Sequence, residues 1–299
     1  MRRSEHSYQL TFFDMAPPAE HVVNVASVQQ RSPFRYPGGK TWLVPRIRQW
    51  LTNLCWEPSV FLEPFAGGAI IGLTVAFEKL AEKVVLVELD EQVAAVWTTI
   101  LSDDCDWLVE RILSFDMTIE NLRRELAHKV TSVKRIAFQT ILKNRTLHGG
   151  IMAPGSGFIK HGENGKGIRS RWYPQTIARR IQAIFDIRDR IEFIHGDGIR
   201  AIRAYNSVRE AAMFIDPPYT AAGKKAGTRL YKYYELDHER LFAEVSKVQG
   251  DILLTYDNAP ELVDIAFRHG FDTRTIRMKN THHTEMTELL IGRSLHWLK

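Results

Sequence analysis

Val60-Phe61-Leu62-Glu63-Pro64-Phe65-Ala66-Gly67-Gly68-Ala69 is a short apolar strand followed by a glycine-rich turn. Residues 70–80 then have helical spacing, and residues 84–87 form a second short apolar run. Glu88 ends that run, 20 positions after Gly68, which is the spacing expected for a carboxylate that accepts hydrogen bonds from ribose hydroxyls. Together these features predict a Rossmann-like unit that binds a nucleoside-containing cofactor. The turn does not read GxGxxG, so a dinucleotide is less favoured.

A second glycine-containing segment, Ser32-Pro33-Phe34-Arg35-Tyr36-Pro37-Gly38-Gly39-Lys40, precedes this unit. The Gly-Gly pair lets a ligand approach the backbone closely, and Lys40 opens an amphipathic helix. A helix N-terminus that carries a lysine favours an anionic group such as a carboxylate or a phosphate. A simple loop-to-helix turn is the alternative, and the Walker pattern is not met.

Another acidic strand end is Met213-Phe214-Ile215-Asp216-Pro217-Pro218-Tyr219. The apolar residues predict a buried strand, and ligands of open α/β sheets bind at the carboxyl ends of the strands. The two prolines fix φ and make their carbonyls rigid acceptors. A carboxylate beside such a carbonyl can accept both hydrogens of one amino group, and a tyrosine can stack on a flat ring. The segment therefore suits an exocyclic amine on an aromatic base; an ordinary Pro-Pro turn is the alternative.

The remaining chain continues the α/β pattern around a mostly helical block. Further strands are expected at residues 191–195, 212–215 and 252–256, and a terminal antiparallel pair at 271–278 and 286–291. The fold class is therefore α/β, a doubly wound sheet with a terminal antiparallel hairpin and an inserted helical domain. The expected division is a tail at 1–30, a catalytic domain at 31–104 and 188–299, and an insert at 105–187.

Charge is concentrated in the insert. Between Arg123 and Arg190 there are 15 Lys/Arg and 4 Asp/Glu, although the whole chain carries only +5. A polyanion-binding segment on an acidic body fits this asymmetry, and nucleic acid is the favoured partner. A solvated helical surface is the alternative. The glycine-rich stretch from 149 to 167 and the basic, aromatic stretch from 220 to 236 are long enough to be functional loops.

Composition excludes several other classes. The 299 residues suffice for one large or two small domains, and 44% of them are hydrophobic. No apolar run approaches the roughly 20 residues that span a bilayer, and the N-terminus lacks the apolar stretch of a signal peptide. Cys55 and Cys105 are the only cysteines and lack metal-binding spacing, so we expect neither a disulfide scaffold nor a metal site. A reducing, cytoplasmic location without membrane contact fits best.

Read together, these motifs resemble the Dam-like (alpha-group) DNA adenine-N6 methyltransferases, from about Ser32 to Arg293. In that family a Gly-Gly-Lys segment and an F-x-G-G turn hold S-adenosylmethionine, and a D-P-P-Y segment holds the target adenine. A target-recognition insert lies between the last two, and the order here is the same. The resemblance implies site-specific methylation of N6 of a flipped-out adenine in double-stranded DNA. It leaves open a cognate restriction endonuclease as partner.

The resemblance also assigns roles to individual residues. Catalytic roles are implied for Asp216, Pro217, Pro218 and Tyr219. S-adenosylmethionine binding is implied for Tyr36, Gly38, Gly39, Lys40, Glu63, Pro64, Phe65, Ala66, Gly67, Gly68, Glu88, Leu89, Asp197, Gly198 and Asp216. Within this set, Lys40 should lie against the methionine part of the cofactor and Asp197 should meet its adenine amino group. Expected DNA contacts are Asn144, Arg145, His148, Lys160, Arg169, Arg171, Lys224 and Arg229.

Two sequence features bear on the recognition site and on the target base. Asn144-Arg145-Thr146 matches the start of the family's recognition hairpin, but the sequence then departs from it, so recognition of GATC is not implied. Asp216 argues for adenine, because related enzymes that methylate cytosine N4 carry Ser there and those with Asn include protein-glutamine methyltransferases. An RNA adenine-N6 methyltransferase and an inactive DNA-binding regulator on the same fold remain the alternatives.

Overall fold

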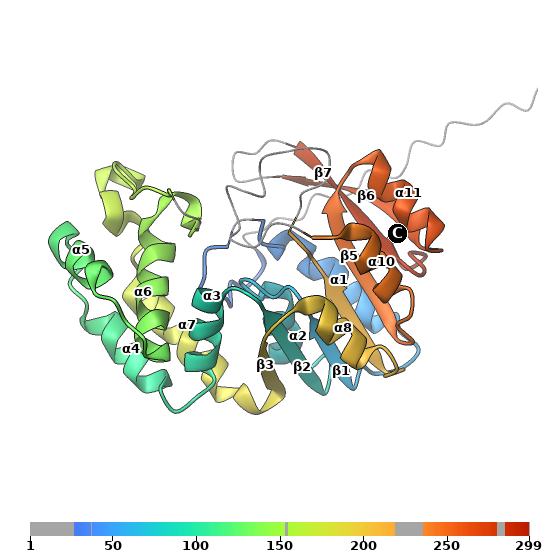
Figure 1. The fold of residues 1–299 in the computed structure, drawn as a ribbon, viewed down its shortest axis with the longest axis horizontal. Coiled ribbons are helices and arrows are strands. Elements are labelled where there is room, and N and C mark those ends of the chain that lie inside the picture. Colours follow the sequence, from blue (N-terminus) through green and yellow to red (C-terminus); the bar gives the residue numbers. More distant parts are fainter. Residues whose placement is uncertain (1–26, 37, 153–154, 219–235, 280–284, 299) are drawn as a thin grey trace, which may run out of the picture.

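The computed structural model describes residues 27–298 except 37, 153–154, 219–235 and 280–284. Within these residues, one mixed sheet has the strand order β3-β2-β1-β4-β5-β7-β6 (Figure 1). The strands are β1 Val60–Glu63, β2 Lys83–Glu88, β3 Ile191–His195, β4 Ala211–Ile215, β5 Asp251–Asp257, β6 Asp272–Lys279 and β7 Glu285–Gly292. The first five are parallel, and β7 runs antiparallel to both β5 and β6. The predicted α/β sheet with its terminal hairpin is confirmed.

Helices cover both faces of the sheet. One face packs against α1 Val44–Thr52, α2 Ile70–Glu78 and α3 Glu91–Ile100; the other packs against α8 Gly198–Tyr205, α10 His238–Val245 and α11 Pro260–Arg268. Successive strand residues alternate between the two layers, as Phe61 and Leu62 do in β1. Because both faces are buried, the parallel strands are continuous apolar runs in the sequence.

Residues 105–187, which the sequence predicts to be an inserted domain, are mostly helical where the structure describes them. Its helices are α4 Cys105–Ser114, α5 Ile119–Ala127, α6 Val133–Thr146 and α7 Pro174–Asp186. Short 3-10 turns lie between α6 and α7, at His148–Gly150, Glu163–Gly165 and Gly167–Arg171. Figure 1 shows them gathered beyond α3, at the β3 side of the sheet. Leu108, Phe138 and Ile181 of the insert belong to the same buried cluster as Phe61 of β1. The insert thus packs onto the catalytic body through a continuous apolar core.

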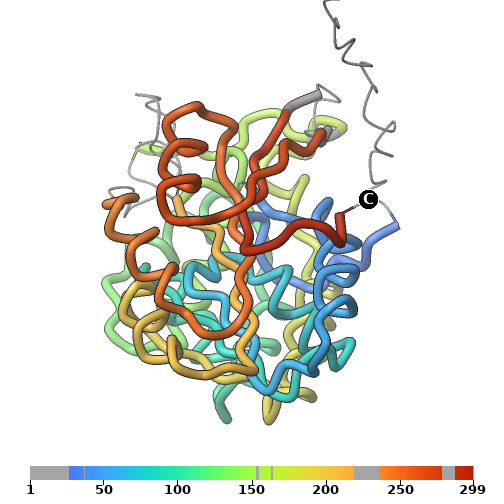
Figure 2. Tube along the Cα trace, turned by 90° about the vertical axis from the view of Figure 1, so that its right-hand side faces the viewer, coloured from blue at the N-terminus to red at the C-terminus, as the bar shows by residue number. Residues whose placement is uncertain are grey.

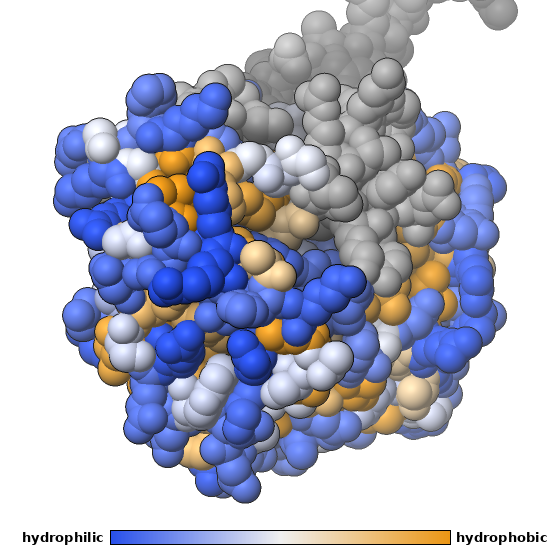
Figure 3. Space-filling view, turned by 60° about the vertical axis from the view of Figure 1, so that its left-hand side comes forward, coloured by the Kyte–Doolittle hydropathy of each residue, from blue (hydrophilic) through white to orange (hydrophobic). Residues whose placement is uncertain are grey.

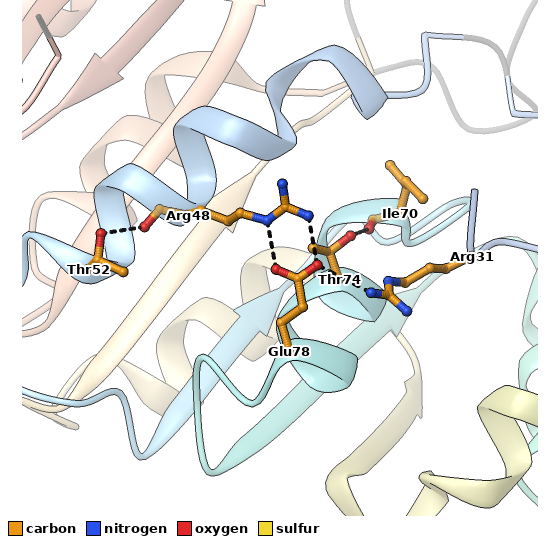
Figure 4. Close-up of polar contacts among 6 residues, drawn as sticks. All are labelled: Arg31, Arg48, Thr52, Ile70, Thr74 and Glu78. Atoms are coloured by element: carbon orange, nitrogen blue, oxygen red, sulfur yellow. Dashed lines mark hydrogen bonds and ion pairs between the residues drawn. The ribbon is translucent and has the colours of Figure 1, made fainter. Parts of the chain in front are cut away.

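The segment before the sheet docks on α1 and α2. Val28 and Phe34 are buried, and Arg31 together with Arg48 of α1 pairs with the carboxylate of Glu78 in α2. Figure 4 shows the Glu78 carboxylate between the two guanidinium groups. The contact with Arg48 first, and that with Arg31 second, hold the pKa of Glu78 below its ordinary value. The part of the expected tail that precedes Ser27 lies outside the described residues.

Element boundaries differ from the sequence prediction in informative places. Helix α6 extends to Thr146, and the polar side chains of its last turn, Asn144, Arg145 and Thr146, are buried and hydrogen-bond to backbone carbonyls. Helix α8 was not predicted; it starts at Gly198 with the Asp197 carboxylate as its N-cap.

Figure 2 views the molecule from the side of the β6–β7 hairpin (red), with the insert (green) behind it. Among the described residues, no helix has the length and apolarity needed to span a bilayer.

Candidate active site

The two motif-bearing turns leave neighbouring strands. β1 lies between β2 and β4, with Leu62 in register with Met213, so the chain order of the strands reverses at this point of the sheet. Ligands of open α/β sheets bind outside the carboxyl ends of the strands at such a switch point. The turn Phe65–Gly68 after β1 and the segment Asp216–Pro218 after β4 therefore start at adjacent places on one sheet edge.

The glycine-rich turn is held tightly in place. The backbone N–H of Ala66 donates to the carbonyl of Val87 at 2.9 Å, and the indole Nε1–H of Trp97 donates to the carbonyl of Gly67 at 3.0 Å. Gly67 has φ of +46°, which is strained for any residue with a side chain. A Cβ on Gly68 would lie 2.9 Å from Cβ of Tyr36, so the tyrosine lies directly against this turn.

Glu88 connects this turn with the start of α3. Its Oε2 accepts from the N–H of Gly67 at 2.8 Å, while its Oε1 accepts from the N–H groups of Leu89 and Asp90, each at 2.8 Å. Burial raises the pKa of Glu88 to about 7, and the backbone N–H groups oppose that shift. Each carboxylate oxygen has two lone pairs, so Oε2 can accept one more hydrogen bond. A hydroxyl donor such as a ribose OH fits this acceptor.

The segments that follow β1 and β3 are in close contact. A Cβ on Gly198 would clash with the carbonyl of Pro64 and lie 3.1 Å from Cε1 of Phe65, so only glycine fits at this position. The Asp197 carboxylate accepts from the N–H of Arg200 at 3.0 Å and so caps α8. Glu63 is buried, and its Oε2 accepts from the N–H of Gly72 at 2.7 Å. Burial raises the pKa of Glu63 well above its ordinary value.

Asp216 is held by groups from two other segments. Its Oδ1 accepts from the hydroxyl of Thr255 in β5 at 2.8 Å and lies 3.0 Å from the Nζ of Lys40. Lys40 is only 3% exposed, and its Nζ also donates to the carbonyl of Gly38 at 3.0 Å. Pro217 is buried and Pro218 partly buried, whereas Tyr219 lies outside the described residues. The lysine expected near the cofactor's methionine thus also contacts the predicted catalytic acid.

The remaining residues of the Gly-Gly-Lys segment form a turn. The N–H of Gly39 donates to the carbonyl of Tyr36 at 3.2 Å, and Gly38 has φ of +72°. The positive φ of Gly38 favours glycine. Gly38 and Gly39 are both exposed at the surface. Leu89, at the end of β2, is exposed as well.

Two of the predicted DNA contacts are buried in the insert. The side-chain amide of Asn144 accepts from the N–H of Arg35 at 2.9 Å and donates to the carbonyls of Arg35 at 2.9 Å and Gly150 at 3.2 Å. The guanidinium of Arg145 donates to the carbonyl of Pro33. Burial, and then the neighbouring Arg180, lowers the pKa of Arg145 to about 9. Both side chains fasten the segment before the Gly-Gly-Lys turn to α6 rather than project from the surface.

Other predicted DNA contacts surround a concavity of about 730 Å³ on the insert. Phe158 lines this concavity and pairs with Leu147 in a short antiparallel bridge. The basic lining residues are Arg123, His148, Lys160, Lys166 and Arg169, all of them exposed. Figure 3 shows this side of the molecule, where hydrophilic residues cover most of the surface and apolar residues appear between them. Arg171 is partly buried, and Lys224 and Arg229 lie outside the described residues.

Three residues at the site were missed in the sequence. Thr255 hydrogen-bonds to Asp216, and Trp97 hydrogen-bonds to Gly67 of the glycine-rich turn. The Oε2 of Glu288 in β7 lies 3.6 Å from the Nζ of Lys40. Glu288 directly precedes the apolar run Leu289–Ile291 in the last strand, and this was the one available signal, since a charge is seldom buried without a partner. The described residues contain no cluster of side chains suited to a metal ion.

Comparison with known proteins identifies the family. Residues 36–279 match the family described as D12 class N6 adenine-specific DNA methyltransferase. No curated protein matches the sequence. Among solved structures, the rRNA methyltransferase aviRa from Streptomyces viridochromogenes is 13% identical, with 91% of this chain and 93% of that one covered and a TM-score of 0.39. Precorrin-6y C5,15-methyltransferase from Geobacter metallireducens is 9% identical, with 86% and 92% covered and a TM-score of 0.36.

The family match spans well over half of the chain and includes both motif-bearing turns. Members of this family use S-adenosylmethionine, and the acceptor at Glu88 beside the glycine-rich turn suits the ribose of that molecule. The chain belongs to the D12 class of N6 adenine-specific DNA methyltransferases.

Proposed function

We propose that this methyltransferase acts at a specific site in double-stranded DNA, with Asp216 and Pro217 as acceptors for the target amine. The observation that carries the proposal is the position of Asp216. It lies at the carboxyl end of β4, next to the glycine-rich turn after β1, with Oδ1 fixed by Thr255 and Lys40. A catalytic acceptor must be held in place in this way, because transition-state stabilisation depends on preorganised groups.

The cofactor pocket is proposed on the β1, β2 and β3 side of the switch point. When bound, S-adenosylmethionine supplies an electrophilic methyl group. Glu88 would accept a hydrogen bond from its ribose, and the Gly67–Gly68 backbone with Tyr36 would line its methionine part. Asp197 and Phe65 would border its adenine. Leu89, Gly198 and the Gly38–Gly39 turn would complete the boundary of the pocket.

The amine itself is a weak nucleophile, because its lone pair is delocalised into the ring. Asp216 would accept one amine hydrogen and the carbonyl of Pro217 the other, which orients the lone pair out of the ring plane. As positive charge grows on N6, the Asp216 carboxylate stabilises it. The proton becomes acidic only after methyl transfer, so no strong base is needed at the start.

The DNA-binding surface is proposed on the insert. A duplex conceals the adenine amine, so the base must leave the helix to reach Asp216. Basic side chains around the concavity, Arg123, Lys160 and Lys166 among them, would neutralise DNA phosphates. His148 and Phe158 line the same concavity and are candidates for contacts with bases. Asn144 and Arg145 would support this surface from beneath, since both are buried.

Methylation mapping tests the proposal. The purified chain is incubated with S-adenosylmethionine and, in separate reactions, with unmethylated duplex DNA, single-stranded DNA or RNA of mixed sequence, and N6-methyladenine is located by sequencing. One recurring sequence around the methylated adenines is the expected result. If only RNA or single-stranded DNA is methylated, the proposed duplex substrate is wrong. If no substrate is methylated, the proposed activity is wrong and the chain can only bind DNA. The map also gives the sequence at which a partner restriction endonuclease would have to cut.

A further inference from the structure

Lys40 lies between two carboxylates. Its Nζ is 3.0 Å from Oδ1 of Asp216 and 3.6 Å from Oε2 of Glu288, and the lysine is almost fully buried. The three residues come from separate parts of the chain: the turn before α1, the end of β4, and the middle of β7. An ammonium group placed this close to Asp216 opposes positive charge on the amine that Asp216 would accept. A second carboxylate beyond the lysine offsets that effect.

The hairpin brings Glu288 to this place through β5. In the antiparallel register Asp257 of β5 lies opposite Glu288, and Thr255, two residues earlier on the same face, bonds to Asp216. The neighbouring strand β6 contributes Ile276 opposite Glu288, a buried apolar side chain. The charged groups that face Glu288 are therefore Lys40, Asp216 and Asp257.

Glu288 is an unusual residue for a position this deep in the sheet. Its exposure is 6%, and within the described chain its Oε2 has no hydrogen-bond partner. Burial raises the pKa of Glu288 to about 7; Lys40 opposes this rise, while Asp216 and Asp257 add to it. A buried carboxyl group whose Oε2 has a 3.6 Å ion pair with Lys40 but no hydrogen bond destabilises a fold, so packing alone does not account for a glutamate here.

We propose that Glu288 is a positioning residue for methyl transfer, which holds Lys40 against Asp216 and balances its charge. The proposal rests on the role assigned above to Asp216. With Glu288 ionised, Asp216, Lys40 and Glu288 together carry a net charge of −1, which favours a cationic amine in front of Asp216. With Glu288 protonated or replaced by a neutral residue, the three groups sum to zero and the stabilisation of that cation falls. Glu288 itself touches neither DNA nor cofactor in this assignment.

The first test is a Glu288→Gln variant, which keeps the shape of the side chain and removes its charge. Transfer of labelled methyl groups to duplex DNA is measured under saturating conditions, together with KM for both substrates. We expect kcat to fall by about tenfold or more, which corresponds to the loss of one charge contact, with KM for DNA nearly unchanged. A Glu288→Asp variant should recover part of kcat. Full activity of Glu288→Gln would overturn the inference.

The pH profile gives a readout that a packing role would not change. In the wild-type protein kcat should fall as pH decreases through about 7, because Glu288 becomes protonated. Glu288→Gln should lose that acidic limb. Asp257→Asn removes a carboxylate that raises the pKa of Glu288, so the limb should move to lower pH. This second variant keeps the test decisive if Glu288→Gln does not fold, and an unmoved limb would refute the inference.

The two proposals fail in different ways. If the wild-type protein methylates no adenine, the role assigned to Asp216 is wrong and the role of Glu288 falls with it. If the wild-type protein methylates duplex DNA while Glu288→Gln equals it in kcat and pH profile, only the inference about Glu288 is wrong.

Discussion

A Cβ atom on Gly67 would lie only 2.6 Å from Cε1 of Tyr36. The tyrosine ring therefore rests on the glycine-rich turn, and the two segments, 31 residues apart in the chain, form one wall at the carboxyl end of β1. The positive φ of Gly67 reinforces the need for glycine, because a side chain is strained there whatever the surrounding space.

This contact predicts the effect of Gly67→Ala. The added methyl group displaces Tyr36 and strains the turn by about 1–2 kcal/mol, so S-adenosylmethionine should bind at least about tenfold more weakly. Isothermal titration calorimetry measures the affinity. Gly157→Ala is the matched control, since nothing lies within 4 Å of the Cβ it adds. Equal affinity of the Gly67 variant and the control would show that the cofactor does not depend on this wall.

Substitution of Asp216 separates binding from transfer. Asp216→Asn keeps an acceptor for the Thr255 hydroxyl but removes the charge beside Lys40. We expect kcat for methyl transfer to fall by about 10²-fold or more, with cofactor affinity changed much less. Asp216→Ala should have at least as large an effect. Persistent transfer by both variants, followed with labelled methyl groups, would exclude Asp216 as the amine acceptor.

The raised pKa of Glu88 predicts that cofactor affinity depends on pH. The pKa of about 7 means that the carboxylate is mostly protonated at about pH 6 and mostly ionised at about pH 8. If the ionised form binds the ribose, affinity should rise by about tenfold between these values. Equilibrium dialysis at each pH checks this. Glu88→Gln should bind weakly with little pH dependence; an equally steep dependence in that variant would assign the titration to another group.

The basic concavity predicts a salt effect. Replacing Arg123, Lys160 and Lys166 by alanine should weaken DNA binding and lower the slope of log affinity against log salt by about 0.9 for each lost phosphate contact. Arg200→Ala, on the exposed surface of α8, should leave the slope unchanged. Fluorescence anisotropy across salt concentrations measures both. An unchanged slope in the triple variant would place the DNA elsewhere.

Glu78 predicts a stability effect with a defined pH dependence. Arg48 and Arg31 hold the pKa of Glu78 in the folded protein below the ordinary value of 4.5. The ionised carboxylate therefore stabilises the fold fully above pH 4.5, and this stabilisation is lost as the pH falls through the lowered pKa of the folded state. Glu78→Gln should lower the free energy of unfolding by about 1 kcal/mol at neutral pH, since Arg48 is partly exposed and solvent screens the pair.

Urea denaturation at neutral and acidic pH measures this contribution. The difference between wild type and Glu78→Gln should shrink on acidification. Glu192→Gln is the control, because its pair with Lys83 is 3.7 Å long and largely exposed on both sides. A difference for Glu78→Gln that grows at low pH would mean that the ion pair is not its cause.

The sequence by itself determined the fold class and the order of the motifs. Val60 to Glu88 predicted a strand, a turn, a helix and a second strand that ends in an acid, because buried parallel strands are apolar throughout and turns with positive φ need glycine. Asp216-Pro217-Pro218 predicted a strand end suited to an amine for the same local reasons. These signals depend on neighbours along the chain and can be read without the structure.

The tertiary structure alone decided which residues act together. Asn144 and Arg145 are polar residues in a basic segment, yet they are buried against backbone carbonyls that lie more than 100 residues earlier. Lys40, Asp216 and Glu288 meet only because the order β4-β5-β7 brings the hairpin beside the β4 end. The side-chain pattern of one strand cannot show which charges lie across the sheet, and strand pairing is what brings Glu288 beside Lys40 and Asp216.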